Sequence, residues 1–212
     1  MPPAPRVTSK NPLQVVLIAD DSGSMSGEPA AKVTDGLQDF ISKLQSFKGG
    51  EKSYFRILFV TFGSQPKVVH EFADILQVKV PDFKVTGDSG NTNIDLALEL
   101  VAAKMEAHRP QSELDPAPLV LFWSDGQNTG GDPRPAAQRI KSLQCPGGRT
   151  PLVIACGFGQ AESGTLEGIS SSPEHSRLFQ KAEELVAFLG NVGTMVTSAK
   201  SMDQVREETR EL

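Results

Sequence analysis

The chain has few of the residues from which zinc centres and disulfide scaffolds are built. Its 212 residues include 2 cysteines and 3 histidines. Cys145 and Cys156 are too few for a disulfide scaffold and lack the C-x-x-C spacing of a redox pair, so we interpret both as packing thiols. His70 falls on an apparent edge strand, and His108 and His175 lie near loops, so we expect all three to face solvent.

An excess of positive charge and a long hydrophobic run are also missing. There are 21 lysines and arginines against 26 acidic residues, a net charge of −5 and a pI near 5.3, which argues against binding to phosphate backbones. We therefore expect no nucleic-acid partner. No apolar stretch has the length of a membrane span, and residues 1–10 contain no apolar leader. From this we predict a cytoplasmic protein with no membrane contact.

The length and composition are those of one globular domain. Hydrophobic residues make up 38% of the chain. A domain of this size buries roughly 70% of the surface that its unfolded chain exposes, so it needs no metal to hold its core together. Any metal is therefore expected to serve function. We place the domain at residues 12–198, with a flexible segment at 1–11 and a charged tail or helix extension at 199–212.

Short apolar segments alternate with stretches of helical periodicity. This pattern predicts an α/β fold, in which a three-layer, doubly wound (Rossmann-like), mostly parallel sheet is covered on both faces. The four-residue turn at 63–66 predicts one antiparallel edge strand. The expected strands are 13–19, 54–62, 67–72, 119–123, 152–156 and 177–179, and the expected helices are about 33–47, 94–105, 135–143 and 183–196.

Polar residues follow the expected strands where each one ends. Asp20, Ser22 and Ser24 follow the first strand, Thr92 lies in a later loop, and Asp125 follows the strand at 119–123. Ligands of parallel sheets bind at the carboxyl ends of the strands, where these side chains would meet. Carboxylate and hydroxyl oxygens suit Mg²⁺ or Mn²⁺. No His or Cys is among these five residues, which argues against a zinc site.

Other interpretations of these residues remain open. The serines could simply cap the helix that starts near Pro29. Asp20 could be the acceptor of a metal-dependent phosphotransfer or receiver-like protein, and the chain could be a scaffold whose ion site is empty in the cell. We further expect Asp20, Asp21 and Asp125 to converge at one edge, where a divalent cation would cancel or invert their field.

The motif Asp20-Asp21-Ser22-Gly23-Ser24 resembles the D-x-S-x-S signature of von Willebrand factor A (VWA) domains. Thr92 and Asp125 match the family's other two motif positions in order, and the resemblance covers roughly residues 12–196. It implies the VWA fold and a non-enzymatic module with a metal-ion-dependent adhesion site (MIDAS). In such a site Ser22, Ser24 and sometimes Thr92 would contact the ion directly. Asp20 and Asp125 would act through water, so the ion could accept an Asp or Glu carboxylate from a protein partner.

A second resemblance concerns the segment after the signature. Ser26-Gly27-Glu28-Pro29, in a compact chain, is similar to small bacterial members of the tellurite-resistance TerY type. This resemblance implies a role in a stress-response or defence system. The partners would then include a protein kinase and a phosphatase of the same system.

Overall fold

A computed structural model describes residues 5–199 and 201–211, so residues 1–4 of the expected flexible segment and residues 200 and 212 of the expected tail lie outside it. Within the described ranges, no helix is long and apolar enough to cross a membrane. The strands are β1 (Leu13–Asp20), β2 (Phe55–Phe62), β3 (Pro66–Asp74), β4 (Leu119–Ser124), β5 (Leu152–Gly157) and β6 (Ser176–Leu178). The helices are α1 (Glu28–Ser46), α2 (Ile94–Ala107), α3 (Arg134–Lys141), α4 (Ser163–Ile169), α5 (Ala182–Ser198) and α6 (Met202–Glu211).

The six strands form one sheet in the order β3-β2-β1-β4-β5-β6. All neighbouring pairs are parallel except β2 and β3, which form an antiparallel hairpin at the edge. This arrangement confirms the predicted fold class. Every residue of β1, β4 and β5 is buried, as expected for central strands covered on both faces.

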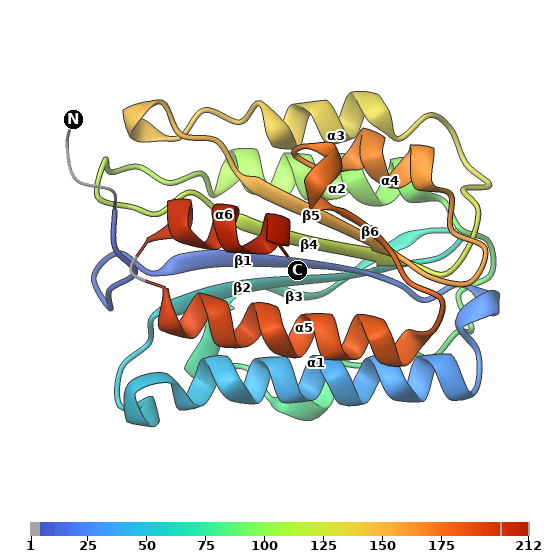
Figure 1. The fold of residues 1–212 in the computed structure, drawn as a ribbon, viewed down its shortest axis with the longest axis horizontal. Helices are drawn as coiled ribbons and strands as arrows, with labels where there is room; N and C mark the ends of the chain where they lie inside the picture. The colour runs from blue at the N-terminus through green and yellow to red at the C-terminus, as the bar shows by residue number, and fades with distance from the viewer. Residues whose placement is uncertain (1–4, 200, 212) are drawn as a thin grey trace.

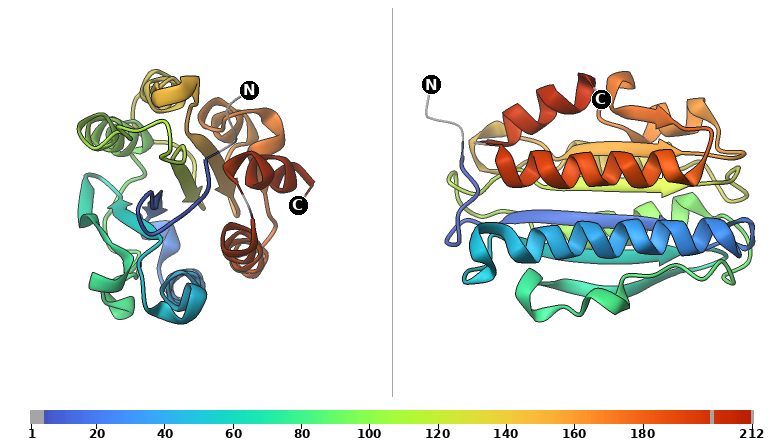
Figure 2. Two further views of the ribbon diagram at one scale, coloured as in Figure 1. Left: turned by 90° about the vertical axis from the view of Figure 1, so that its left-hand side faces the viewer. Right: turned by 60° about the horizontal axis from the view of Figure 1, so that its bottom comes forward.

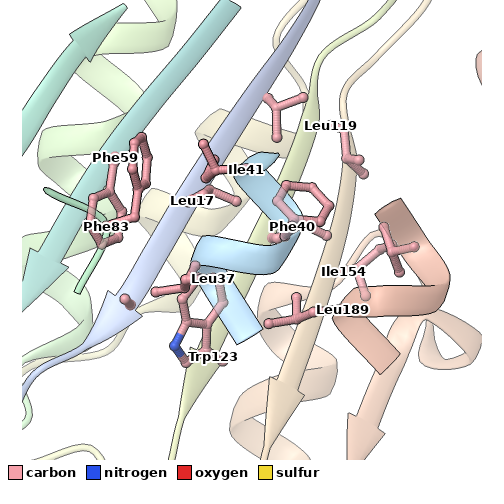
Figure 3. Packing of buried hydrophobic residues seen from close by; sticks show 14 of the residues in the cluster. Leu17, Leu37, Phe40, Ile41, Phe59, Phe83, Leu119, Trp123, Ile154 and Leu189 are labelled. Carbon is pink, nitrogen blue, oxygen red and sulfur yellow. The ribbon is translucent and has the colours of Figure 1, made fainter. Parts of the chain in front are cut away.

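Helices cover both faces of the sheet and make a three-layer molecule (Figures 1 and 2). On one face α1 and α5 pack against alternate strand residues, and Leu37, Phe40 and Leu189 meet Leu17 and Trp123 there (Figure 3). On the other face α2, α3 and α4 cover the remaining alternate residues. The two cysteines are free and buried, which confirms their interpretation as packing thiols.

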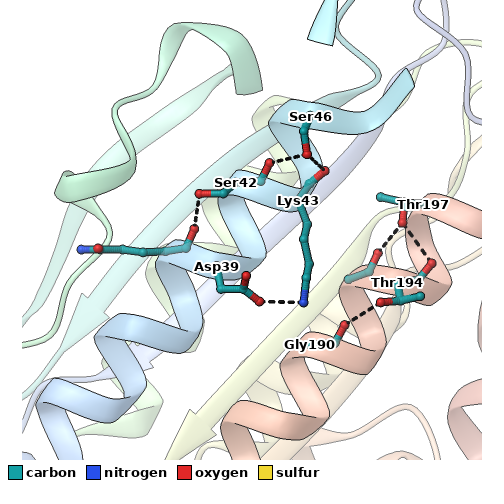
Figure 4. Close-up of polar contacts among 9 residues, drawn as sticks. Asp39, Ser42, Lys43, Ser46, Gly190, Thr194 and Thr197 are labelled. Carbon is teal, nitrogen blue, oxygen red and sulfur yellow. Dashed lines mark hydrogen bonds and ion pairs between the residues drawn. The ribbon is translucent and has the colours of Figure 1, made fainter. Parts of the chain in front are cut away.

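Helices α1 and α5 lie side by side and are joined by an ion pair between Lys32 and Glu183, while other polar side chains are satisfied within one helix. Asp39 and Lys43 form an i,i+4 ion pair at 2.6 Å on α1, and the Thr194 hydroxyl donates to the Gly190 carbonyl on α5 (Figure 4). These contacts leave the apolar stripe of each helix for the sheet. The two helices thus support the central strands with their apolar residues, and Gln45 of α1 also donates to the carbonyls of Ile75 and Val78.

The parallel strands set the position of the candidate site. In the β1–β4 register Ala19 lies opposite Trp123, so the loops after the two strands leave the sheet side by side. Asp20 is the last residue of β1, and Asp125 directly follows β4. Both therefore lie at the carboxyl edge of the sheet, at the right-hand end of Figure 1. This confirms the edge that the sequence predicted.

Helix α6 and His175 differ from the sequence expectations. Residues 199–212 were expected to be a charged tail or an extension of the last helix, but Ala199 leaves the helical conformation and α6 forms a separate helix. Met202, Val205 and Thr209 of α6 are buried. The expectation that His175 faces solvent is wrong, since it is 1% exposed beneath α6. Helix α4 was not predicted, because two glycines among its seven residues weaken its helical pattern.

His175 connects α6 to the body of the domain as a neutral side chain. The Arg206 carbonyl can only accept, so Nε2–H of His175 donates to it at 3.1 Å, and the Ser172 hydroxyl donates to Nδ1 at 2.7 Å. Burial, the largest effect, lowers the pKa of His175 below its ordinary value of 6.5. The positive charges of Arg206, Arg210 and Arg177 lower this pKa further, whereas the hydrogen bond to the backbone carbonyl of Arg206 raises it.

Acid is therefore expected to destabilise the fold through His175. As the pH falls below about 6.5, the unfolded chain takes up a proton on this histidine before the folded chain does, so the free energy of unfolding decreases. His175→Gln, which keeps a donor for the Arg206 carbonyl, should reduce the loss of stability between about pH 7 and pH 5. Urea unfolding at pH 7 and pH 5 measures this loss of stability for the wild type and the variant. The same substitution at exposed His108 is the control, and an equal acid loss in wild type and His175→Gln would contradict the assignment.

Candidate functional site

Asp20 forms the floor of the site at the end of β1. Its side chain is fully buried, and both carboxylate oxygens have a partner. Oδ1 accepts from the backbone N–H of Ser22 at 2.8 Å, and Oδ2 accepts from the hydroxyl of Ser124 at the end of β4. The carboxylate thereby fixes the turn after β1 and connects it to the neighbouring strand.

A chain of hydroxyl contacts leads from Asp20 toward the surface. The hydroxyls of Ser22 and Ser24 lie 3.0 Å apart, and the Ser24 hydroxyl donates to Oδ1 of Asp125 at 2.6 Å. Ser22 is buried, whereas Ser24 is exposed. Four of the five predicted site residues are therefore joined in one network that opens to solvent.

Thr92 reaches the same place from the loop before α2. Its backbone N–H donates to the Thr129 hydroxyl at 3.0 Å, and Thr129 donates its own N–H to the Thr92 carbonyl at 2.9 Å, which ties the loop to the segment after β4. A side-chain carbon placed on Gly126 would lie 3.3 Å from Oγ1 of Thr92 and 3.4 Å from Oγ of Ser24. The two hydroxyls thus face a small space that the missing side chain of Gly126 leaves open.

The site carries negative charge without a neighbouring cation. No ion pair to Asp20 or Asp125 occurs in the described part of the chain. Burial is the largest effect on both groups and raises the pKa of Asp20 and of Asp125. Hydrogen bonds, from Ser124 and Ser22 to Asp20 and from Ser24 to Asp125, act in the opposite direction.

Two buried carboxylates that lack a cation fit a bound divalent ion, since a metal supplies the missing positive charge. The described residues contain no cluster of three or more His, Cys, Asp or Glu that could hold a metal. A metal held here would therefore depend on the hydroxyls of Ser22, Ser24 and Thr92 in addition to the two carboxylates. Such an all-oxygen set suits hard cations such as Mg²⁺.

Asp21 lies at the same edge, but its carboxylate faces another loop. It accepts from the backbone N–H groups of Thr86 and Gly87, the latter at 2.8 Å, and from the hydroxyl of Ser89 at 2.8 Å. Gly87 has φ of 72° and leaves no room for a side chain, which would lie 2.3 Å from the backbone nitrogen of Ser26. Asp21 thus lies at the expected edge with Asp20 and Asp125, but its side chain anchors the 86–89 loop.

Ser124 and Asp21 are the structural supports of the site that the motif did not reveal. Ser124 is 1% exposed, and its hydroxyl donates to Asp20 from the neighbouring strand. One signal for it was available, since a hydroxyl residue ends an otherwise apolar strand immediately before Asp125. The partners of Asp21 lie 65 to 68 residues away along the chain, and no local pattern indicates them.

Solved structures share this fold at low sequence identity, and no curated protein matches the chain. Proximal thread matrix protein 1 from the mussel byssus is 18% identical with a TM-score of 0.70, over 92% of this chain and 50% of that one. A further structure of that protein has a zinc-occupied MIDAS motif, with 16% identity and a TM-score of 0.68 over 90% of this chain and 47% of that one. The pilus adhesin SpaC from Lactobacillus rhamnosus GG is 15% identical with a TM-score of 0.73, over 91% of this chain and 31% of that one.

This chain spans half or less of each of these proteins, and at such identities the likeness shows the fold alone. The assignment to a family comes from the sequence model of the von Willebrand factor type A domain, which matches residues 14–189. Domains of this family are typically metal-dependent modules for protein interaction and adhesion. The matched span runs from β1 into α5 and includes the Asp20–Ser24 loop, Thr92 and Asp125, so the chain belongs to the von Willebrand factor type A domain family.

Proposed function

We propose that this chain is a non-enzymatic, Mg²⁺-dependent protein-binding module. Ser22, Ser24 and Thr92 would hold the ion directly, and Asp20 and Asp125 would hold it largely through water. The observation that carries the proposal is the convergence of two buried carboxylates that lack a cation with three hydroxyls at one edge of the sheet.

The ligand set explains how such an ion would select a partner. Neutral hydroxyls in direct contact leave most of the charge of the ion uncompensated. Mg²⁺ requires six oxygen ligands and can take one of them from an incoming carboxylate. The partner would therefore offer an Asp or Glu side chain, even though this chain has a net charge of −5. Mn²⁺ has the same preference for oxygen and is the second candidate ion.

The competing proposal, a phosphotransfer or receiver-like protein that uses Asp20, has less support. A phosphoacceptor must present a carboxylate oxygen to the incoming phosphate. Asp20 is 0% exposed, and its two oxygens accept from Ser22 and Ser124. The geometry favours a supporting role for Asp20 beneath the ion.

The TerY-like assignment stays a prediction, together with its stress-response role, its kinase and phosphatase partners and the cytoplasmic location. It rests on Ser26-Gly27-Glu28-Pro29, for which the fold gives a local explanation. Gly27 precedes α1 with φ of 79°, and Pro29 occupies the first turn of the helix, where its missing N–H is not needed. The segment therefore supports the helix start and adds no argument for a particular partner.

Removal of the metal is expected to lower the melting temperature of the chain. At a free Mg²⁺ concentration 100 times the dissociation constant, binding stabilises the folded state by about 2.7 kcal/mol, which is roughly 5–10 °C for a domain of this size. Thermal melting in MgCl₂ and in EDTA measures the difference. Identical melting curves in millimolar MgCl₂ and in EDTA would contradict occupancy of the site.

Partner capture tests the second half of the proposal. The immobilised chain should retain a protein partner from a cell lysate in MgCl₂ and release it in EDTA. Asp20→Asn bait should fail to retain it, whereas Asp88→Asn, with the same change at an exposed carboxylate of the 86–89 loop, should retain it. Capture that is equal in MgCl₂ and EDTA would contradict a metal-dependent contact.

A further inference from the structure

A cavity of about 220 Å³ lies at the end of the molecule opposite the candidate metal site. It opens where β5 begins at Leu152, between the 148–150 loop and the first turns of α6. Its lining contains the apolar residues Ala117, Leu152 and Met202 and the charged residues Arg149, Arg206 and Asp203. Met202, Asp203 and Arg206 come from α6, so the docking of this helix creates the cavity.

The two arginines of the cavity have carbonyl partners and no carboxylate partner. Nη2 of Arg206 donates to the Thr150 carbonyl at 3.0 Å, and Nη2 of Arg149 donates to the Glu113 carbonyl. Nε of Arg149 is buried without any partner. Neither guanidinium forms an ion pair with any carboxylate of the described ranges.

Two surface arginines of the chain differ from the cavity arginines in that each forms an ion pair. Arg134 and Arg139 are exposed, and each forms an ion pair at 2.8 Å with a neighbouring carboxylate, Asp132 and Glu106 respectively. Arg149 and Arg206 are partly buried, and Asp203, the acidic side chain of the cavity, is exposed. Two positive charges and one negative charge therefore border the cavity.

A partly buried guanidinium that forms no ion pair is costly, because burial removes hydration that no close carboxylate replaces. Burial lowers the pKa of Arg206 and is the largest effect. The charge of Asp203 raises this pKa, and the charge of Arg210 lowers it. An oxyanion that enters the cavity would supply the missing acceptors, because the planar guanidinium matches carboxylate and phosphate geometry. The apolar lining residues would at the same time favour a ligand with an apolar body.

We propose that this cavity binds a small organic anion, with its carboxylate or phosphate head against Arg149 and Arg206 and its apolar body against Ala117, Leu152 and Met202. The size is suitable, since a cavity of about 150 Å³ already holds benzene. The ligand would contact α6 and the body of the domain together, and so would hold α6 in place. This site is separate from the candidate metal site and requires no divalent ion.

The test is an NMR titration of the ¹⁵N-labelled full chain in EDTA. The probes are benzoate and phenyl phosphate, with benzyl alcohol as the uncharged analogue and KCl to match ionic strength. At least one anion should cause saturable shifts of the amides of Thr150, Leu152, Met202 and Arg206, and benzyl alcohol should not. The anion that binds more tightly identifies the head group.

Arg206→Gln should weaken the binding of the anion by roughly tenfold or more, because a charge-assisted hydrogen-bonding partner is lost. Arg206→Lys keeps the charge without the planar fork and should give an intermediate affinity. Arg139→Gln, the same change at a paired arginine on the opposite face, should bind like wild type, and circular dichroism checks that each variant folds. If Arg206→Gln does not fold, Arg206→Lys and Arg149→Gln supply the same comparison. No saturable shift with either anion, equal shifts with benzyl alcohol, or wild-type affinity in the folded arginine variants would overturn the proposal.

Discussion

Asp20→Asn is expected to abolish the stabilisation of the chain by Mg²⁺ and to leave its stability in EDTA equal to or above that of wild type. Asn keeps an acceptor for the Ser22 N–H and a partner for the Ser124 hydroxyl. It also removes one of two buried negative charges that have no cation nearby. Loss of this charge should weaken Mg²⁺ binding by roughly 100-fold or more. Calorimetric titration with MgCl₂ and thermal melting with and without EDTA measure the two effects.

Asp88→Asn is the matched control for this variant. Asp88 is an exposed carboxylate of the same edge, and its replacement removes the same charge from the surface. It should change the Mg²⁺ affinity by no more than about twofold at physiological salt, where exposed charges are screened. An Asp20→Asn protein that binds Mg²⁺ as tightly as Asp88→Asn would show that the ion, if bound, lies elsewhere.

Asp21→Ala is expected to have the largest effect on stability among substitutions near the site. Its buried carboxylate accepts from the backbone of Thr86 and Gly87 and from the hydroxyl of Ser89. Loss of these charge-assisted bonds leaves buried donors without a partner, and we expect the free energy of unfolding to fall by about 3 kcal/mol. Urea unfolding in EDTA measures this loss without a contribution from metal.

The same variant should also weaken Mg²⁺ binding, by roughly tenfold, through the position of the first loop. The Gly23 N–H donates to the Gly90 carbonyl at 2.8 Å, so release of the 86–89 loop also loosens the turn that contains Ser22 and Ser24. Asp35→Ala, at an exposed position of α1, is the control and should change the free energy of unfolding by less than about 0.5 kcal/mol. Equal stability of the two alanine variants in EDTA would contradict the anchoring role of Asp21.

The two aspartates show which part of the site was predictable. Asp20 and Asp125 each follow an apolar strand, and parallel strands place such residues at one edge of the sheet. Asp21 is adjacent to Asp20, but successive side chains at a strand end point in different directions. Its partners come from residues 86–89, and only the folded chain brings that loop to β1. The motif therefore predicted the group of residues but not the direction of each side chain.

Helix α6 and His175 illustrate the same limit away from the site. The segment Met202–Glu211 is rich in charged residues, and its buried side consists of Met202, Val205 and Thr209. Its burial depends on Arg177, which donates to the Thr209 carbonyl at 2.8 Å, and on His175, which donates to the Arg206 carbonyl. His175 and Arg206 are 31 residues apart in the chain, and Arg177 and Thr209 are 32 residues apart, so no local rule predicts the two contacts.

The sequence by itself determined the alternation of strands and helices, the antiparallel edge hairpin and the polar residues at the strand ends. These features depend on periodicity and turn composition, which act over a few residues. Tertiary structure alone decided that Asp21 anchors a loop, that Ser124 supports Asp20, that His175 is buried and that α6 closes a cavity lined by two arginines that form no ion pair. Each of these features depends on a contact between segments that are distant in the chain. The free energy of such a contact depends on burial, which only the packed molecule provides.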